Sequence, residues 1–320
     1  MSALPLADAS HGELCIRLGL MALWRGHGNF PSINLRECSL AAEPTFALCA
    51  ILKDESDYIE EWLAFHILQG VSRVILYDNN SSDDTCERAR SFAKSIDIQV
   101  ISWPDSARGF DRTQRRAYVD GARRLSGAAD YVAFIDLDEF LFASDYGPLG
   151  QTLAAFPTEI AAVAVNQRIF GSSGQKSSTG DLVTSRFTMT AAADYPEGYF
   201  FKTIARPDRI IRFDSVHSVV LTSGTYVLSD GCPLPPRPDH PGFSSLITDG
   251  ALRLHHYMLK SRQEFERKRQ RWAGQDLSNR LTDEYFSERD RSVNAVRDER
   301  LTVFAERIRE LIGRARGGAR

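Results

Sequence analysis

The chain has 320 residues, of which 43% are hydrophobic and 25% charged, a composition typical of a globular protein with a sizeable core. Its 39 basic and 42 acidic residues give a formal net charge of −3, which excludes a general electrostatic attraction to nucleic acid. The five cysteines are scattered and have no CxxC spacing, so we expect neither a disulfide framework nor a structural zinc site.

The sequence also bears on location in the cell. No apolar run approaches the roughly 18 residues needed to span a bilayer. The first residues include Asp8, His11 and Glu13 before a broken apolar stretch, which is not the pattern of a secretion signal. We therefore expect a cytoplasmic protein, and association with the inner face of a membrane stays open.

The first half of the chain alternates between strand and helix patterns. Strands are predicted over 45–52, 73–78, 98–102 and 131–136. Helices are predicted from an N-cap at Asp57 to Gly70, over 85–93, and over 112–125. Short loops between alternating strands and helices predict an α/β fold with a mainly parallel central sheet and helices on both faces.

The second half is less regular. Strands are predicted over 161–168, 182–190 and 252–257, and the proline-rich stretch 231–242 is interpreted as an active-site loop or lid. We divide the chain into an N-terminal extension (1–43), a catalytic domain (44–260), and a charged helical segment (261–320) that packs on that domain or extends from it.

Polar clusters follow three of the predicted strands. They are Lys53-Asp54-Glu55, Asp78-Asn79-Asn80 and Asp136-Leu137-Asp138-Glu139. In parallel sheets ligands bind outside the carboxyl ends of the strands, so the three clusters predict a site at one edge.

The acidic cluster after the fourth strand contains the pair Asp136 and Asp138. Mg²⁺ and Mn²⁺ favour carboxylate ligands and usually share them with the phosphates of a ligand. The plainer interpretation is two solvated loop carboxylates that cap the next element. The neighbouring clusters favour the metal site.

Histidines give a second set of candidates. His255 and His256 end a short apolar segment, and Lys260 follows at a distance from which it could meet a diphosphate. A neutral imidazole is a common metal ligand, whereas the alternative is a half-buried histidine that packs on a tyrosine. We expect His66 and His217 to be structural.

Four motifs in the same order give the chain a family resemblance. The chain resembles glycosyltransferase family 92 in the motifs LKDESDYIEEWLAFHILQGVSRVILYDNNSSDDT, YVAFIDLDEFL, NQRIFGSSG and HHYMLKSRQEFERKRQRW. Related bacterial enzymes that are classified loosely in glycosyltransferase family 2 share the pattern. The resemblance covers about residues 46–300. It implies a GT-A fold, a nucleotide-sugar donor such as UDP-galactose, a divalent cation (Mn²⁺ or Mg²⁺), and inversion at the anomeric carbon.

The resemblance also implies roles for single residues. Donor binding is expected at Lys53, Asp54, Glu55, Asp78 (facing the base), Gln114, Asp136 and Lys260 (beside the diphosphate), and metal binding at Asp136, Asp138 and His256. The chain departs from the family where NQRIF stands in place of an expected tryptophan, and its N-terminal extension is too short for the accessory domain of some relatives. The acceptor is therefore not implied.

Transfer also needs a base for the acceptor hydroxyl. We expect a carboxylate after the acidic pair: Glu197, beside aromatic residues in PEGYFFK, or Asp239, with Asp194 and Asp230 as further candidates.

The resulting prediction is a metal-dependent hexosyltransferase that acts on a UDP-hexose and a glycan or other hydroxyl acceptor, as in polysaccharide biosynthesis. One alternative is a non-catalytic nucleotide- or sugar-binding protein of the same fold. Another is a phosphohydrolase with paired aspartates, although its motif would have Thr or Val at Phe140 and would follow the first strand.

Overall fold

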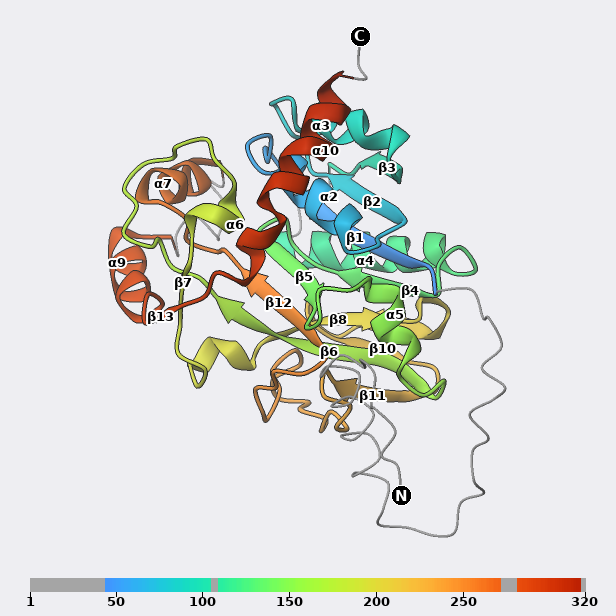
Figure 1. The fold of residues 1–320 in the computed structure, drawn as a ribbon. Helices are drawn as coiled ribbons and strands as arrows, with labels where there is room; N and C mark the ends of the chain where they lie inside the picture. Colours follow the sequence, from blue (N-terminus) through green and yellow to red (C-terminus); the bar gives the residue numbers. More distant parts are fainter. Residues whose placement is uncertain (1–43, 105–108, 272–280, 318–320) are drawn as a thin grey trace, which may run out of the picture.

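A computed structural model describes residues 44–104, 109–271 and 281–317. The predicted extension 1–43 lies outside the described residues. The described part is built around one large sheet with helices on both sides (Figure 1). Its strands are β1 (Phe46–Leu52), β2 (Arg73–Asp78), β3 (Asp97–Ser102), β4 (Tyr131–Phe134), β5 (Glu139–Ala143), β6 (Ile160–Ile169), β7 (Met189–Thr190), β8 (Phe201–Ala205), β9 (Ile210–Phe213), β10 (Val219–Leu221), β11 (Thr225–Leu228), β12 (Leu252–His256) and β13 (Val296–Arg297).

Within the described residues the main sheet has nine strands, in the order β3-β2-β1-β4-β8-β6-β12-β5, with β11 also paired to β6. The pairs β1–β2, β2–β3, β1–β4, β6–β11 and β6–β12 are parallel. The pairs β4–β8, β6–β8 and β5–β12 are antiparallel. The prediction of an α/β fold with a mainly parallel sheet is therefore confirmed.

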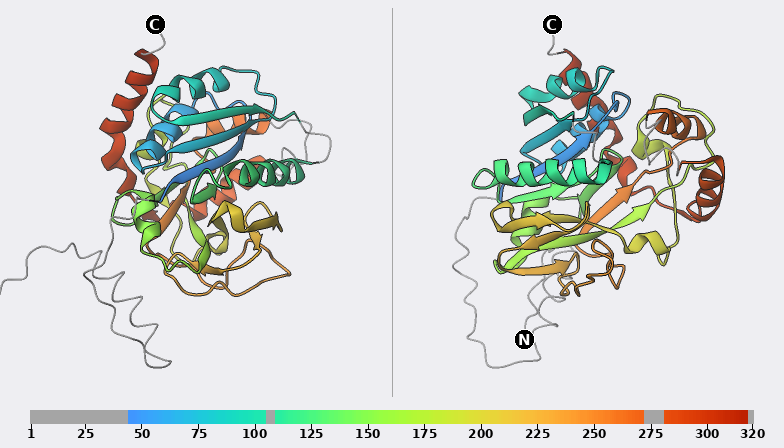
Figure 2. Two further views of the ribbon diagram at one scale, coloured as in Figure 1. Left: turned by 90° about the vertical axis from the view of Figure 1, so that its right-hand side faces the viewer. Right: turned by 180° about the vertical axis from the view of Figure 1, so that it is seen from behind.

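Helices cover both faces of the sheet (Figures 1 and 2). They are α2 (Ile59–Leu68), α3 (Thr85–Ser91), α4 (Phe110–Leu125), α5 (Leu149–Ala154), α6 (Val183–Arg186), α7 (Arg262–Arg271), α9 (Asp283–Ser292) and α10 (Ala305–Gly317), with 3-10 turns η1 (Phe92–Lys94), η2 (Pro196–Tyr199), η3 (Pro207–Arg209) and η4 (Arg300–Phe304).

Strand β1 explains why helices must pack on both faces of the sheet. All seven of its residues are buried. Leu48, Ala50 and Leu52 join the core under α2, while Ala47, Cys49 and Ile51 join the core under α4. Because successive side chains of a strand point to opposite faces, an unbroken apolar run requires packing on both.

Helix α2 begins later than predicted. Its N-cap is Tyr58 rather than Asp57, and no side chain caps it. The carbonyl of Glu55 accepts the amides of Tyr58 (2.9 Å) and Ile59 (3.0 Å), so a backbone turn starts the helix. Inside it, His66 is structural as predicted: Leu141 donates its amide to His66 Nε2 (3.2 Å), and His66 Nδ1 contacts the Trp62 carbonyl (2.8 Å).

The prediction of a strand over 182–190 was wrong. The chain instead forms the short helix α6, and only Met189–Thr190 is a strand. The buried carboxylate of Glu61 accepts the amides of Val183 (2.6 Å) and Thr184 (2.9 Å), as a helix cap does. This cap comes from a residue more than a hundred positions away, so no local pattern indicated it.

The charged C-terminal segment is helical and packs on the main domain, although the boundary at residue 260 stays a prediction. Helix α10 lies against α2 (Figure 1), and Arg316 binds the Glu60 carboxylate with Nε at 2.8 Å. In α9, Asp290 accepts the amide of Ser172 (2.7 Å) in the GSSG turn.

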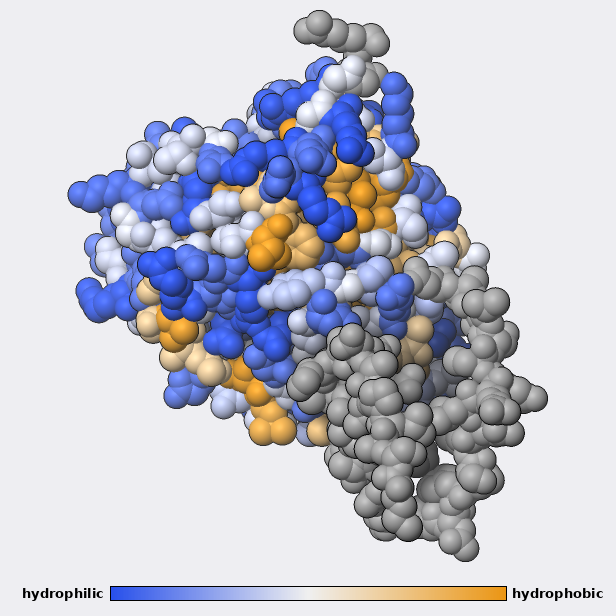
Figure 3. Space-filling view, viewed as in Figure 1, coloured by the Kyte–Doolittle hydropathy of each residue, from blue (hydrophilic) through white to orange (hydrophobic). Residues whose placement is uncertain are grey.

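The surface seen in Figure 3 is mostly hydrophilic, with hydrophobic residues in small separate patches. Such isolated patches are normal on a globular protein. None of the helices in the described ranges is long and apolar enough to cross a membrane.

Candidate active site

The three predicted polar clusters meet at one edge of the sheet. Strands β1, β2 and β4 are parallel, and their register places Leu52 beside Asp78 and Cys49 beside Phe134. The segment 53–55, Asp78 and the turn after β4 therefore all leave the sheet at its carboxyl edge, as predicted.

Asp54 and Asp78 shape the loop that follows β2. Asp54 has a left-handed backbone (φ 50°), and its Oδ1 accepts the amide of Ser82 (2.6 Å). The Oδ1 of Asp78 accepts the amide of Ser81 (3.0 Å). Both carboxylates thus order a loop at the site, and their contact with a nucleotide stays a prediction.

A cavity of about 220 Å³ opens at this edge. Its walls come from the segment after β1, the turn after β4, the end of β12, and α7. Among the residues that line it are Lys53, Glu55, Asp136, Asp138, His256 and Lys268.

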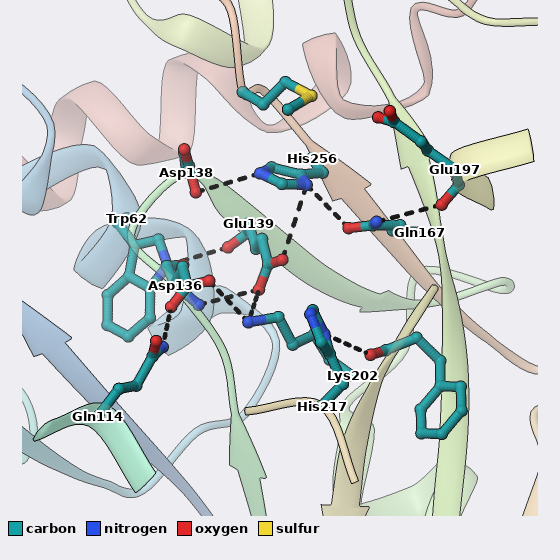
Figure 4. A network of polar contacts seen from close by, with 12 residues as sticks. Trp62, Gln114, Asp136, Asp138, Glu139, Gln167, Glu197, Lys202, His217 and His256 are labelled. Carbon is teal, nitrogen blue, oxygen red and sulfur yellow. Dashed lines mark hydrogen bonds and ion pairs between the residues drawn. The ribbon is translucent and has the colours of Figure 1, made fainter. Parts of the chain in front are cut away.

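Asp136 is held from two sides (Figure 4). Gln114, on α4, donates Nε2 to Oδ1 (2.7 Å), and Lys202, on β8, donates Nζ to Oδ2 (2.6 Å). Burial alone would raise the pKa of Asp136, but the Lys202 ammonium outweighs it and holds the pKa below its ordinary value. The prediction that Gln114 belongs to the site agrees with this contact.

The turn that carries both aspartates is fixed by its own surroundings. Trp62 Nε1 donates to the carbonyl oxygens of Asp136 (3.1 Å) and Glu139 (2.9 Å), and Glu139 Oε2 accepts the Asp136 amide (2.9 Å). Tyr257 donates its amide to the Asp138 carbonyl (2.8 Å). These bonds aim both carboxylates at the cavity.

Asp138 faces the predicted histidine. His256 Nε2 lies 3.4 Å from Asp138 Oδ1, and Lys268 donates Nζ to Asp138 Oδ2 (2.8 Å). Burial opposes ionisation of Asp138, but Lys268 and then His256 outweigh it, so its pKa lies well below the usual range. Asp138 is therefore favoured in its ionised form.

Gln167 indicates the tautomer of His256. Its Nε2 donates to the Glu197 carbonyl (3.2 Å), so its Oε1 faces His256 Nδ1 at 2.8 Å and accepts a hydrogen bond from it. The other ring nitrogen, Nε2, faces the Asp138 carboxylate. At 3.4 Å a proton or a cation can bridge this nitrogen and Asp138 Oδ1.

These atoms fit the divalent cation that the resemblance implies. Asp138 Oδ1 and His256 Nε2 are suitable ligands, and the remaining positions suit oxygens of a diphosphate or water. The oxygens of Asp136 already accept from Gln114 and Lys202, and among the described residues no group of three or more His, Cys, Asp or Glu is set to hold a metal. A ligand role for Asp136 therefore stays a prediction.

Lys202 was missed in the sequence. Lys202 is 2% exposed. Its Nζ lies 3.4 Å from Glu139 Oε2, in addition to its hydrogen bond with Asp136. Burial lowers the pKa of Lys202, but Asp136 and Glu139 outweigh it and leave it raised. The available signal was a single lysine inside the apolar strand YFFKTIA, a position where a buried cation needs anionic partners.

The sequence pattern did not single out Lys268 either. Lys268 contacts Asp138, whereas Lys260 was the lysine predicted to lie beside the diphosphate. Lys260 is buried, and its Nζ lies 4.2 Å from the centre of the Tyr58 ring. Burial lowers the pKa of Lys260. At the end of α7, Arg271 forms an ion pair with Glu55, so this helix forms one wall of the cavity.

The two candidate bases lie apart from this cluster. The Glu197 carboxylate forms an ion pair with Arg289 and lies beyond Gln167 as seen from Asp136 (Figure 4). The Asp239 side chain is 66% exposed and lies 3.5 Å from Arg237 in the proline-rich loop. The structure brings neither to the acidic pair, and their catalytic roles stay predictions.

His217, predicted to be structural, lies beside Lys202 (Figure 4). Its Nδ1 bonds to the Phe201 carbonyl (3.0 Å), which can only accept, so this nitrogen carries the proton. Burial, and then Lys202, lower the pKa of His217 to about 3. The ring is therefore neutral and its Nε2 is unprotonated.

Most of the described chain up to β11 matches a known protein family. The model of glycosyltransferase family 92 matches residues 45–228, which is more than half of the chain. The chain belongs to glycosyltransferase family 92. The resemblance seen in the sequence motifs is thereby confirmed, and the mainly parallel sheet with helices on both faces is the GT-A fold predicted with it.

Two plant members of family 92 are similar to this chain. A protein of Oryza sativa subsp. japonica is 28% identical over 169 residues, which are 52% of this chain and 27% of the rice protein. A protein of Ricinus communis is 27% identical over 227 residues, which are 64% of this chain and 39% of that protein. The chain thus spans well under half of the relatives it matches.

Among solved structures, the chain is similar to glucosyl-3-phosphoglycerate synthase from Mycobacterium tuberculosis in complex with Mn²⁺, UDP-glucose and phosphoglyceric acid. The identity is 19%, with 66% of this chain and 79% of that chain covered, at a TM-score of 0.35. At this TM-score the similarity is too weak to assign a ligand.

The family 92 match ends before β12 and α7. His256 and Lys268 lie beyond it, yet both contact Asp138 inside it. The candidate site therefore contains residues from both sides of residue 228, where the match ends.

Proposed function

We propose that this chain is a metal-dependent glycosyltransferase that transfers a hexose, such as galactose, from a UDP-sugar to a hydroxyl group of a glycan or similar acceptor. The observation that supports it best is the pair of possible metal ligands, Asp138 Oδ1 and His256 Nε2, which lie 3.4 Å apart in a cavity at the carboxyl edge of a family 92 domain. This geometry suits a divalent cation shared with a diphosphate.

In the proposed reaction, negative charge develops on the leaving diphosphate. A cation held by Asp138 and His256 would act there as a Lewis acid. Lys268, already at Asp138 and facing the cavity, adds a fixed positive charge beside it. Family membership and this charge arrangement support transfer of a glycosyl group.

Lys202 orients Asp136 for the proposed reaction. It holds Asp136 ionised, and Gln114 fixes the other oxygen, so the Asp136 carboxylate is oriented before any ligand arrives. A preorganised carboxylate of this kind could accept a hydrogen bond from a hydroxyl group of the sugar donor, or it could complete the coordination of the cation.

Inversion at the anomeric carbon requires an acceptor hydroxyl in line with the leaving group and a base for its proton. Glu197 and Asp239 remain the proposed candidates. Glu197 would first have to exchange its partner Arg289 for the acceptor, because the two now form an ion pair.

The phosphohydrolase alternative is less well supported. Its paired aspartates would follow the first strand of the sheet along the chain, whereas Asp136 and Asp138 follow β4. Phe140, where that motif would have Thr or Val, is buried in the core.

A thermal-shift panel tests the proposal. The full chain is melted with UDP-galactose, UDP-glucose, UDP-N-acetylglucosamine and GDP-mannose, each with and without Mn²⁺. We expect a UDP-sugar to raise the melting temperature most, and more so with Mn²⁺. Equal shifts for all four sugars, with or without Mn²⁺, would contradict it. Tight UDP binding that never leads to turnover would instead support the non-catalytic alternative.

A further inference from the structure

A second polar pocket lies on the other face of the strands that carry His256. It has a volume of about 130 Å³ and is lined by residues of β6, β12 and the loop before β12, together with Arg300 of η4. The register places His255 beside Arg168 and His256 beside Ile169. Because neighbouring side chains alternate, His255 and His256 point to opposite faces, and one layer of strands separates the two sites.

His255 is the unusual residue of this pocket. It is 1% exposed, and neither ring nitrogen has a hydrogen-bond partner. The rings of Phe170 (centroid distance 4.6 Å) and Phe142 (4.8 Å) pack against it. A buried imidazole without partners is costly, so these atoms call for a ligand that donates or accepts hydrogen bonds.

The pocket also holds an unsatisfied cationic donor. Arg253 shares the face of His255, two residues earlier on β12, and its buried Nε has no hydrogen-bond partner. The other end of this guanidinium is occupied, because Nη1 lies 2.8 Å from Asp249 Oδ1. The Nε end of this guanidinium is therefore left without an acceptor among the described residues.

The charges around the pocket do not cancel. Arg168, Arg253 and Arg300 line it, opposed by Asp249 and by Asp298, which pairs with Arg300 at 2.5 Å. Three guanidinium groups against two carboxylates leave one positive charge. Asp298 also lies 3.6 Å from His255 Nε2.

We infer that this pocket binds a small oxyanion, a phosphate or a carboxylate group, between Arg168, Arg253 and His255. The anion lies against the guanidinium groups of Arg168 and Arg253, which line the pocket, and it balances the excess positive charge. The volume admits a single such group and excludes a nucleotide. This site is distinct from the proposed donor site, which lies on the opposite face of β12.

The test is isothermal titration of the full chain with inorganic phosphate, and separately with acetate, against sodium chloride at the same ionic strength. We expect binding of one or both anions but not of chloride, and the two titrations tell a phosphate site from a carboxylate site. Arg168→Gln should raise the dissociation constant at least tenfold. His255→Phe, which suits the aromatic surroundings, should do the same while keeping the fold.

Two matched variants test whether the anion binds elsewhere. Arg112→Gln removes a charge from the arginine-lined groove beside α4, and Lys268→Gln removes one from the proposed donor site. Both should leave the dissociation constant unchanged. No binding of either anion, unchanged binding in Arg168→Gln, or loss of binding in either of these two variants would overturn the inference. If His255→Phe does not fold, Arg168→Gln still decides.

Discussion

Lys202 and Asp136 form an ion pair of 2.6 Å that joins the antiparallel strand β8 to the turn after the parallel strand β4. The lysine side chain is 3% exposed, and the buried carboxylate of Glu139 lies on its other side at 3.4 Å. One buried cation thus serves two anions of the acidic turn.

We therefore expect Lys202→Met to destabilise the protein by about 3 kcal/mol, because it leaves Glu139 and Asp136 without their cation. Urea denaturation measures this. Lys176→Met, at an exposed position, is the matched control and should change stability little. The double variant Lys202→Met/Glu139→Gln should recover part of the loss. A single variant as stable as the wild type would contradict the role of this pair.

Asp138→Asn should abolish metal-dependent transfer. The substitution removes the anionic ligand and leaves Lys268 without its partner, so the free energy of unfolding should also fall by about 1–3 kcal/mol. Turnover with a UDP-sugar and a circular dichroism melt measure the two effects. Turnover near the wild-type rate would mean that Asp136 and Asp138 only form a turn and bind no catalytic metal.

The two neighbouring histidines should behave differently. His256→Ala should raise the Mn²⁺ concentration for half-maximal activity more than tenfold, or about 1.4 kcal/mol, because its Nε2 faces Asp138. His255→Ala should shift this concentration far less and lower the melting temperature instead, since its ring is buried among aromatic side chains. Equal Mn²⁺ curves would remove histidine from the metal site, and a reversed order would assign the ligand to His255.

Helix α7 should loosen in acid through Glu264. Burial alone would raise the pKa of Glu264, but the Arg186 guanidinium and the Ser261 hydroxyl outweigh it and lower the pKa from 4.5 to about 2. A depressed folded-state pKa means that the stabilisation is fully present above about 4.5 and is lost as the pH falls towards 2. Urea midpoints in this range should therefore fall less in Glu264→Gln than in the wild type.

Glu266→Gln is the control for that comparison. Glu266 lies on the same helix, and its side chain is 43% exposed. Its substitution should leave the pH dependence as it is in the wild type. Parallel curves for the wild type and Glu264→Gln would contradict the account of the ion pair.

The sequence predicted the parts of the fold that depend on local pattern. The apolar runs of β1 and β2, and the polar residues directly after them, were enough to place the site at the carboxyl edge of the sheet. Asp138 and His256 followed from the family motifs. The structure separates the two neighbouring histidines, because His255 is fully buried and His256 lines the cavity.

The residues that were missed depend on contacts between distant segments. Lys268 lies in the charged helix RQEFERKRQR, where no pattern distinguishes the lysine that contacts Asp138 from its solvated neighbours. The short helix α6 replaced a predicted strand because Glu61 caps it from another part of the fold. Such effects come from tertiary contacts, which override local propensity.

The most direct test of the central claim is calorimetric titration with UDP, GDP and ADP, with and without Mn²⁺, on the wild type and on Asp138→Asn. We predict that the wild type binds UDP more tightly than GDP or ADP, that Mn²⁺ strengthens the binding of UDP, and that Asp138→Asn loses this effect of the metal. Preference for another nucleotide, or UDP binding that is indifferent to Mn²⁺ in the wild type, would contradict a metal-dependent UDP-sugar transferase.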